Sequence, residues 1–273
     1  MTFPAEVSLN APTAAFDAIA NTYDEVFTRT PIGRAQRNLV WREVTSTFRR
    51  GDRILELNCG TGEDAFFLVS RGIAVIACDA SQRMIDLAQG RQANESCSSD
   101  VQFRCVRTED IGKLHLDALF DGVFSNFSGL NCVEELEPVA NDLAAITKPG
   151  AKVCLCLSAR TCFWEVGWFI AHANFRRAFR RIGGQSLAKV GGQALKVWYP
   201  TIRNIKRAFS PPFRLISHRA IGLAVPPTYV GLKAATNTRI LGLLENLDWT
   251  FGGWPILRSL GDHVLLTFEK VRP

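Results

Sequence analysis

The feature that most constrains how this chain folds is the segment 53–64, RILELNCGTGED. An apolar run comes first, a turn with Gly60 and Gly62 follows, and a helix-like apolar segment begins at Ala65. A strand, a glycine turn and a helix in this order point backbone N–H groups at an anionic or polar ligand. The two glycines can take backbone angles closed to other residues, so a ligand can approach the main chain closely.

A second apolar run, 73–78, leads directly into Asp79. In folds of this kind, an acid at the tip of the second strand binds the ribose of a nucleoside. Enzymes that bind dinucleotides use the spacing G-x-G-x-x-G, but Ala65 stands where the third glycine would be. The sequence therefore favours a nucleoside cofactor and disfavours an NAD-type oxidoreductase. A strand–turn–helix unit without any ligand is the alternative.

The loop from Glu56 to Gly62 resembles the E-x-G-x-G-x-G loop of class I S-adenosylmethionine (SAM) methyltransferases. Asn58 stands where that family usually has its first glycine, and Asn is the non-glycine residue that best tolerates left-handed backbone angles. The resemblance covers most of residues 14–158 and, more weakly, 197–273. It implies methyl transfer from SAM, which leaves S-adenosylhomocysteine (SAH).

The resemblance also implies a doubly wound α/β fold with a seven-stranded, mostly parallel sheet of the Rossmann-like methyltransferase type. Apolar runs at 101–106, 119–127 and 151–157 supply further strands, and helices separate them, as in a parallel sheet. We expect residues 263–269 to be the antiparallel edge strand. The predicted division of the chain is 1–50 as an N-terminal helical lid, 51–158 as the SAM-binding core, 159–200 as a basic and aromatic substrate-lid insertion after strand five, and 201–273 as the end of the core sheet with that edge strand.

Residues 14–27 place apolar side chains at helical spacing, and their pattern F-D-x-x-A-x-x-Y-D resembles the N-terminal helix of small-molecule methyltransferases. In those relatives the helix closes over SAM, which implies that Tyr23 lies near the methionine end. Simple packing on the core is the alternative for this helix. The residues after the ribose acid lie under the adenine ring in the family, so Ala80 and Met84 are candidate contacts, with core packing as the alternative for Met84.

Methyltransferases often carry an acid directly after the third strand, where it binds the adenine amino group. Arg107 occupies that position here, so the resemblance implies that adenine is recognised through the backbone of Thr108 and Glu109. Asn126, at the tip of the fourth strand, would border the reaction centre, and a strand-end cap is its alternative role. The predicted cofactor-binding residues are Tyr23, Glu56, Asn58, Cys59, Gly60, Gly62, Asp79, Ala80, Met84, Thr108, Glu109 and Asn126.

Positive charge is concentrated in residues 159–219. This segment holds twelve Lys and Arg against a single acid, Glu165, whereas the whole chain carries 32 Lys and Arg and 26 Asp and Glu. The apolar stretch 163–170 is followed by the arginines of 176–181, a combination that suits peripheral contact with an anionic membrane. We favour a lid over a small-molecule or lipid-like acceptor. Contact with RNA and a plain solvated face are the alternatives, and nucleic acid is the less favoured partner.

The composition also limits the compartment. The N-terminal segment lacks the basic start and apolar core of a signal peptide, and no apolar run reaches the ~18 residues that a membrane span requires. The eight cysteines show no C-x-x-C pair and no Cys/His spacing typical of a metal site. We therefore expect a cytoplasmic protein without a bound metal or structural disulfide, either free or in peripheral contact with a membrane through 163–181.

The sequence predicts a SAM-dependent methyltransferase that acts on a small-molecule or lipid-like acceptor. The alternatives are an RNA methyltransferase that uses segment 159–219 and a non-catalytic SAM-fold binding protein. A base is needed only when the acceptor must lose a proton. Several side chains have suitable chemistry, but no motif supports any of them, so the catalytic residue stays unassigned. These side chains are His115, Glu165, His172 and Tyr199.

Overall fold

The computed structural model describes residues 11–93, 100–115, 117–230 and 237–272. Nine strands form two sheets within these ranges. The strands are β1 (Arg53–Leu57), β2 (Ala74–Asp79), β3 (Val101–Cys105), β4 (Phe120–Ser125), β5 (Thr147–Ser158), β6 (Gln185–Val190), β7 (Gln193–Trp198), β8 (Phe213–Ile221) and β9 (His263–Lys270). The main sheet has seven strands in the order β3-β2-β1-β4-β5-β9-β8, and β6 and β7 form a separate hairpin.

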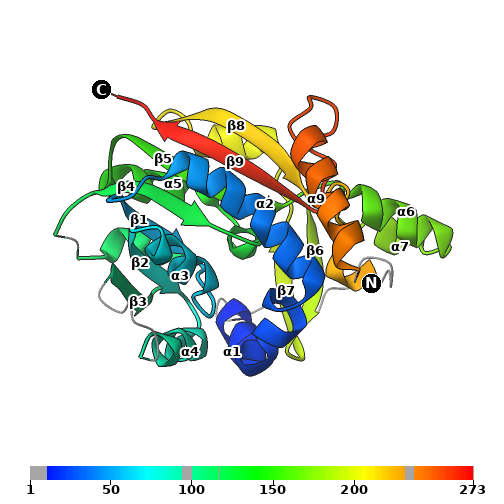
Figure 1. The fold of residues 1–273 in the computed structure, drawn as a ribbon, viewed down its shortest axis with the longest axis horizontal. Coiled ribbons are helices and arrows are strands. Elements are labelled where there is room, and N and C mark those ends of the chain that lie inside the picture. The colour runs from blue at the N-terminus through cyan, green and yellow to red at the C-terminus, as the bar shows by residue number, and fades with distance from the viewer. Residues whose placement is uncertain (1–10, 94–99, 116, 231–236, 273) are drawn as a thin grey trace.

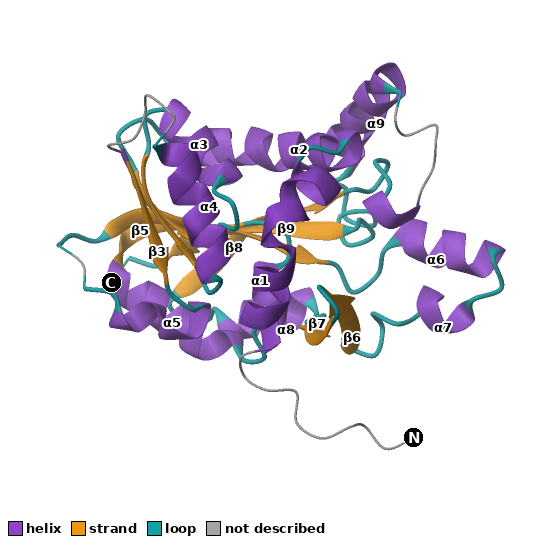
Figure 2. Ribbon diagram, turned by 90° about the horizontal axis from the view of Figure 1, so that it is seen from below, coloured by secondary structure: helices purple, strands orange, loops and turns teal. Residues whose placement is uncertain are grey.

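Helices lie on both faces of the main sheet (Figures 1 and 2). The α-helices are α1 (Ala11–Tyr23), α2 (Pro31–Thr47), α3 (Glu63–Ser70), α4 (Gln82–Gln92), α5 (Leu136–Ile146), α6 (Phe163–Ala171), α7 (Phe175–Ala178), α8 (Ile202–Ala208) and α9 (Thr238–Phe251). A π-helix, Asp24–Thr28, continues α1. Short 3-10 turns cover Thr108–Lys113, Gly129–Cys132 and Thr228–Val230.

Two apolar cores hold these layers together. Side chains of α2, α3, α4 and α9 pack against one face of the sheet, and those of α5 and α8 pack against the other. The central strands β1 and β4 are buried along almost their whole length, as parallel strands are when helices cover both faces. The predicted doubly wound, seven-stranded and mostly parallel sheet is therefore confirmed.

The end of the sheet differs from the prediction in one respect. β9 is antiparallel to its neighbour β5, as expected, but it also pairs with β8, and β8 is the edge strand. The prediction that 263–269 forms the edge is therefore wrong. The physical reason is visible in the burial of β9, because six consecutive residues from His263 to Phe268 are buried, as in an inner strand.

The insertion 159–200 contains α6, α7 and the β6–β7 hairpin, and the glycine pair 191–192 forms the hairpin turn. This turn packs against α1, because a Cβ added to Gly191 would come within 2.6 Å of the Cβ of Ala18. The N-terminal helix and the insertion thus lie side by side (Figure 1). Among the helices of the described residues, none is both long and apolar enough to cross a membrane.

The junction between the π-helix and α2 leaves no room for a side chain at Gly33. Thr30 caps α2 by accepting a hydrogen bond from the backbone N–H of Gly33 at 3.0 Å. A Cβ on Gly33 would come within 2.1 Å of the carbonyl oxygen of Phe27. The close approach fixes the direction in which the chain leaves the π-helix.

We expect Gly33→Ala to lower the free energy of unfolding by about 2–3 kcal/mol, because the added methyl group meets backbone that must shift. Urea denaturation followed by circular dichroism measures the change. Gly242→Ala is the matched control, since Gly242 also lies in a helix but a Cβ there meets no atom within 4 Å. The free energy of unfolding of the control should rise by about 0.5–1 kcal/mol, because Ala has a higher helix propensity than Gly. Equal stability of the Gly33 variant and the wild type would contradict the close approach.

Candidate functional site

Asp79 forms the best-defined part of the site. It ends β2, and its carboxylate is fixed by two backbone donors: the N–H of Gly60 lies 2.8 Å from Oδ2, and the N–H of Ser81 lies 2.8 Å from Oδ1. Burial raises the pKa of Asp79 above its usual value, although these N–H groups oppose the rise. Each oxygen keeps a lone pair, so the carboxylate can accept two further hydrogen bonds.

The glycine turn has the conformation that its sequence predicts. Asn58 has φ 56°, Gly60 54° and Gly62 83°, all in the left-handed region. The side chain of Asn58 also does what glycine cannot: it donates to Oγ1 of Thr108 at 3.0 Å and accepts from the hydroxyl of Ser125 at 3.2 Å. Asn58 thus ties the turn to the end of β4 and to the segment after β3.

Two adjoining pockets open beside this turn. The larger contains about 560 Å³ of space that no atom fills, a volume that includes the open solvent at its mouth. The smaller lies against the start of α3. Of the predicted residues, Asp79, Ala80 and Met84 line the larger pocket, Cys59 lines the smaller one, and four line both. These four are Tyr23, Asn58, Gly60 and Asn126.

The other predicted residues lie near the turn but outside the lining of either pocket. Glu56 is buried, which raises the pKa of its carboxyl group well above the usual value, and its Oε2 has no partner among the described residues. Gly62 packs against Phe103, whose ring atoms a Cβ would meet at 2.8 Å. Thr108 is bonded to Asn58, as described above. Glu109 is exposed and pairs with Arg107 at 3.2 Å.

A buried ion pair lines the smaller pocket, and the sequence did not indicate it. Arg37 of α2 lies 2.5 Å from Oδ2 of Asp64 in α3. Asp64 also accepts from Trp41 Nε1 at 2.6 Å and from Asn126 Nδ2 at 3.0 Å. We call these four residues the Asp64 cluster. Asn126 in addition caps its own strand end, because its Oδ1 accepts from the N–H of Phe127.

Helix α1 closes one side of the larger pocket, and two carboxylates hold it there. Asp17 accepts from the hydroxyl of Ser81 at 2.5 Å, and Asp24 accepts from the hydroxyl of Thr61 at 2.7 Å. Both acids belong to the pattern F-D-x-x-A-x-x-Y-D, in which only Tyr23 had been assigned a role. Burial raises the pKa of Tyr23 to about 12, so its hydroxyl stays protonated.

A second cluster of charged side chains joins the insertion to the core. Arg181 donates to Glu165 at 3.0 Å and to Asp262 at 2.8 Å, and Arg180 makes a two-pronged contact with Glu165. Gln36 of α2 adds a long hydrogen bond to Asp262 at 3.5 Å. We call Glu165, Arg180, Arg181 and Asp262 the Arg181 cluster. Of the twelve basic residues of 159–219, Arg181 therefore pairs inside the protein, and Arg180, whose side chain is 37% exposed, pairs with the buried Glu165 from the surface.

The candidate bases lie elsewhere. Burial would raise the pKa of Glu165, but the hydrogen bond from Arg180 and the charge of Arg181 outweigh it and hold the pKa below its usual value. His172 is exposed beside Trp168 of α6 at a ring distance of 4.3 Å. Tyr199 is buried near Ser186 in the hairpin, and His115 is exposed. In the ranges that the structure describes, no three His, Cys, Asp or Glu side chains group as metal ligands do.

Aromatic rings border the two pockets at Phe127. Its ring makes edge contacts with Phe27 at 4.9 Å and with His263 at 5.4 Å. The guanidinium of Arg37 lies 4.8 Å from the Phe127 ring centroid. Phe27 comes from the π-helix and His263 from the start of β9, so only the folded chain brings these three rings together.

Comparison with known proteins shows that part of the chain is similar to methyltransferases. Residues 54–150 match a family described as a methyltransferase domain. A demethylmenaquinone methyltransferase of Clavibacter sepedonicus is 31% identical over 146 residues, 52% of this chain and 56% of the relative. A 2-phytyl-1,4-naphtoquinone methyltransferase of Synechococcus elongatus is 29% identical over 159 residues, 55% of this chain and 65% of the relative.

A third relative is a tRNA 5-carboxymethoxyuridine methyltransferase of Escherichia coli, 26% identical over 144 residues, 51% of this chain and 54% of the relative. The chain thus spans between half and two thirds of the length of these curated relatives.

Solved structures give the same fold. The CcbJ methyltransferase from Streptomyces caelestis matches with a TM-score of 0.58 at 16% identity, covering 95% of this chain and 99% of that one. The N-methyltransferase NodS from Bradyrhizobium japonicum, in complex with SAH, matches with a TM-score of 0.58 at 14% identity. The match covers 96% of this chain and 100% of that one. The Rossmann-like methyltransferase fold and the resemblance predicted from the sequence are confirmed.

Proposed function

We propose that this chain is a SAM-dependent methyltransferase whose acceptor is a small, lipid-like molecule. The observation that carries the proposal is the carboxylate of Asp79, fixed by the N–H groups of Gly60 and Ser81 at the wall of the larger pocket. An acid in this position suits the two ribose hydroxyls of a nucleoside. The match of residues 54–150 to a methyltransferase domain supports SAM as that nucleoside.

The remaining pocket residues fit the other parts of SAM. Ala80, Met84 and Phe16 offer apolar surface to the adenine ring. Arg37 lines the smaller pocket, and its Nε is buried without a partner among the described residues, which suits the methionine carboxylate. We assign Thr108 and Glu109 to the adenine edge through their backbone, as predicted from the sequence.

When bound, SAM supplies a methyl group that its sulfonium already activates. The residues of this chain then have to hold and orient the acceptor and exclude water. The rings of Phe27 and Phe127 offer an apolar wall for a flat acceptor. Helix α1, held in place by the hydrogen bonds of Asp17 and Asp24, shields the pocket from solvent. Glu165, whose charge is neutralised by two arginines, does not serve as a base.

Two observations support the proposed class of acceptor: the aromatic wall of Phe27 and Phe127, and the acceptors for which the relatives are named. A phytyl-naphthoquinone is flat at one end and lipid-like at the other, and the relative named for it is 29% identical to this chain over 159 residues. An RNA acceptor is less favoured because two arginines of the basic segment already pair with buried carboxylates. Arg181 is buried between Glu165 and Asp262, and Arg180, although partly exposed, pairs with Glu165. We include peripheral membrane contact through 163–181 in the proposal, since a lipid-like acceptor resides in membranes.

Calorimetric titration tests the cofactor. We expect SAH to bind in the micromolar range and NADH not to bind. Binding of NADH alone would instead support an oxidoreductase, and binding of neither would favour a non-catalytic protein. With SAH binding established, transfer of a labelled methyl group from SAM to a reduced naphthoquinone, compared with transfer to bulk tRNA, tests the acceptor. Label in the tRNA alone would reverse the proposed acceptor class.

A further inference from the structure

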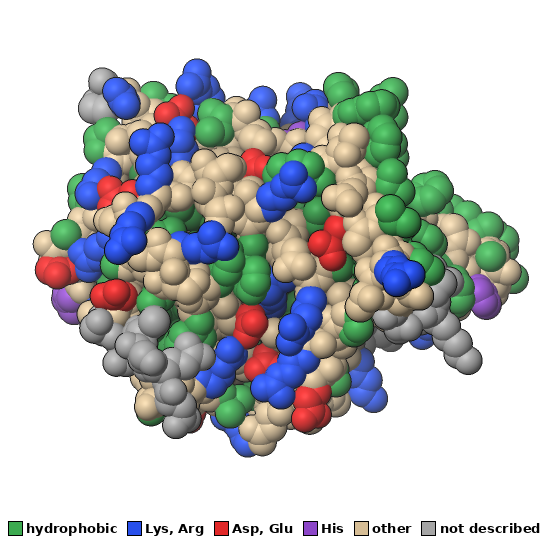
Figure 3. Space-filling model, viewed as in Figure 1, with side chains coloured by type: hydrophobic (Ala, Val, Ile, Leu, Met, Phe, Trp, Pro, Cys, Tyr) green, Lys and Arg blue, Asp and Glu red, His purple; other side chains and the backbone are tan. Residues whose placement is uncertain are grey.

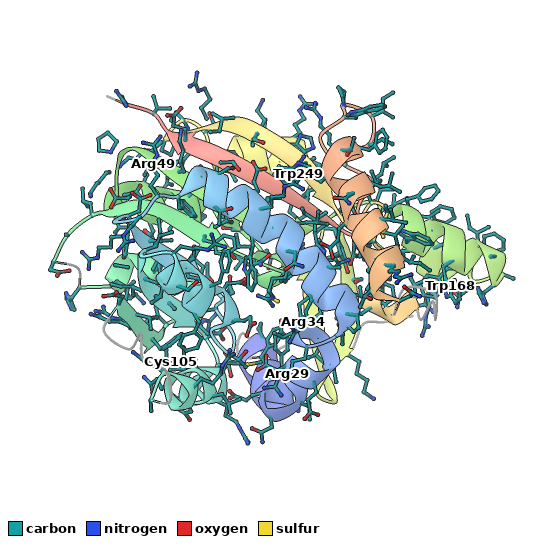
Figure 4. The ribbon with its side chains drawn as sticks, in the orientation of Figure 1. Arg29, Arg34, Arg49, Cys105, Trp168 and Trp249 are labelled. Carbon is teal, nitrogen blue, oxygen red and sulfur yellow. The ribbon has the colours of Figure 1, made fainter. Side chains whose placement is uncertain are left out.

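Helix α9 was not anticipated from the sequence, and its inner face is firmly attached to the core. Leu241 is buried in the core that covers one face of the sheet. Trp249, on α9, is labelled in Figure 4. The centre of its ring lies 3.9 Å from the guanidinium group of Arg42 in α2 and 3.8 Å from that of Arg219 in β8. These contacts fix which side of the helix faces outward.

The outer face of α9 is also apolar. Leu243 is 66% exposed and Leu247 45% exposed, and Ile240 lies on the same stripe because the three are spaced three and four residues apart. The turn after α9 continues the stripe with exposed Trp254 and with Ile256, which is 84% exposed. A helix that is apolar on two sides buries one side in its own core and leaves the other exposed, which is typical of a surface that binds a partner or a membrane.

The apolar surface continues onto α6 and α7. Figure 3 shows hydrophobic side chains gathered over α9 and onward over α6. The two parts are joined directly, because the N–H of Phe163 donates to the carbonyl of Leu260 at 2.9 Å. Phe163 and Phe175 are 63% and 60% exposed. Single exposed apolar residues are ordinary, but a patch across three helices is not.

The charge around this patch has one sign. Arg176, Arg177 and Arg239 are exposed at its margin. The acids of 159–190 and 237–262 are Glu165, Glu245, Asp248 and Asp262, and all but Glu245 are buried. An apolar patch with exposed arginines at its margin and almost no exposed carboxylates complements a surface that is apolar inside and anionic at its face, as a bilayer with acidic lipids is.

We propose that the outer face of α9, the turn 254–256 and the exposed side of α6 and α7 form one surface that lies on an anionic bilayer. This docking face goes beyond the segment 163–181, and it rests on the proposed function for its purpose. α6 follows the carboxyl end of β5, next to the end of β4 where Asn126 lines both pockets. The docking face therefore lies at the same end of the sheet as the site, where a lipid-like acceptor would leave the membrane.

Vesicle co-sedimentation of the full chain tests this surface. We expect binding to phosphatidylcholine vesicles that contain phosphatidylglycerol, and weaker binding to phosphatidylcholine alone. The double variant Leu243→Ser/Leu247→Ser should lose at least about tenfold in affinity, because both side chains leave the lipid. The matched control is Leu119→Ser, since Leu119 is 43% exposed but precedes β4 at the opposite end of the sheet. The control should bind as the wild type does.

The charge of the docking face is tested separately. Arg176→Gln and Arg239→Gln should each weaken binding to the anionic vesicles about fivefold, and added salt should reduce this difference. Neither substitution should change binding to phosphatidylcholine alone.

Two results would overturn the proposal. One is the absence of wild-type binding to the anionic vesicles. The other is a stable dimer in sedimentation velocity that Leu243→Ser/Leu247→Ser converts to monomer, which would make this face an interface between two copies. SAH calorimetry on the wild type and on the same variants keeps the two proposals distinct. A wild type that binds SAH but not the anionic vesicles refutes only the docking face, and normal SAH binding by the variants shows that their loss of vesicle binding comes from the surface and not from the cofactor site.

Discussion

Asp79→Asn is expected to weaken SAH binding by about two to three orders of magnitude while the protein stays folded. The substitution removes the charge and replaces one acceptor oxygen with a donor, which then faces a backbone N–H of Gly60 or Ser81. Hydrogen bonds to a charged group contribute about 1.5–3 kcal/mol each, and two such bonds to a ribose correspond to this loss. Calorimetry measures the affinity, and a thermal melt checks the fold.

Glu109→Gln is the control for Asp79. Glu109 is also an acid near the predicted adenine edge, but its side chain is exposed and pairs with Arg107. Since only its backbone is assigned to the cofactor, the variant should bind SAH within about twofold of the wild type. Normal SAH binding by Asp79→Asn would show that the ribose site has been placed wrongly.

Arg37→Met and Asp64→Leu should each lower the free energy of unfolding by about 3–5 kcal/mol, because each leaves the other charge buried and unpaired. Both side chains are only 6% exposed. The Asp64 variant should be the less stable of the two, since Trp41 and Asn126 also lose their acceptor. Urea denaturation of the single and double variants gives the coupling energy of the pair.

The double variant Arg37→Met/Asp64→Leu should recover much of the loss, because it removes both charges together. Lys113→Ala provides the contrast at the surface. Its ion pair with Asp110 joins side chains that are 81% and 38% exposed, and its loss should cost less than about 1 kcal/mol. Strictly additive effects of the Arg37 and Asp64 substitutions would contradict a direct ion pair.

Local chemistry is what the sequence reveals most reliably in this chain. The turn from Asn58 to Gly62 requires left-handed backbone angles, and which residues tolerate these angles depends on residue type. The strands on either side follow from short apolar runs. The resemblance to a known loop adds Asp79 as the predicted ribose acid. The strand, turn and cofactor predictions therefore needed no knowledge of distant residues.

Features that depend on distant partners could not be predicted in this way. Arg37 meets Asp64 only because α2 lies across the start of α3, and nothing in either segment indicates the other. Charge counting treated Arg181 as part of a surface patch, whereas Glu165 and Asp262 surround it in the interior. The outer position of β8 likewise follows from the pairing of β9 with two neighbours, which a single strand pattern does not reveal.

Consecutive residues of α2 reach the Arg181 cluster and the Asp64 cluster. Gln36 reaches Asp262 of the Arg181 cluster, and Arg37 reaches the Asp64 cluster beside the smaller pocket. Both side chains are buried, so neither can exchange its partner for water. If α2 slid along its axis or turned about it, both sets of contacts would separate at once. The insertion, proposed to lie over the acceptor, and the pocket proposed for the cofactor are therefore held in place by the same turn of one helix.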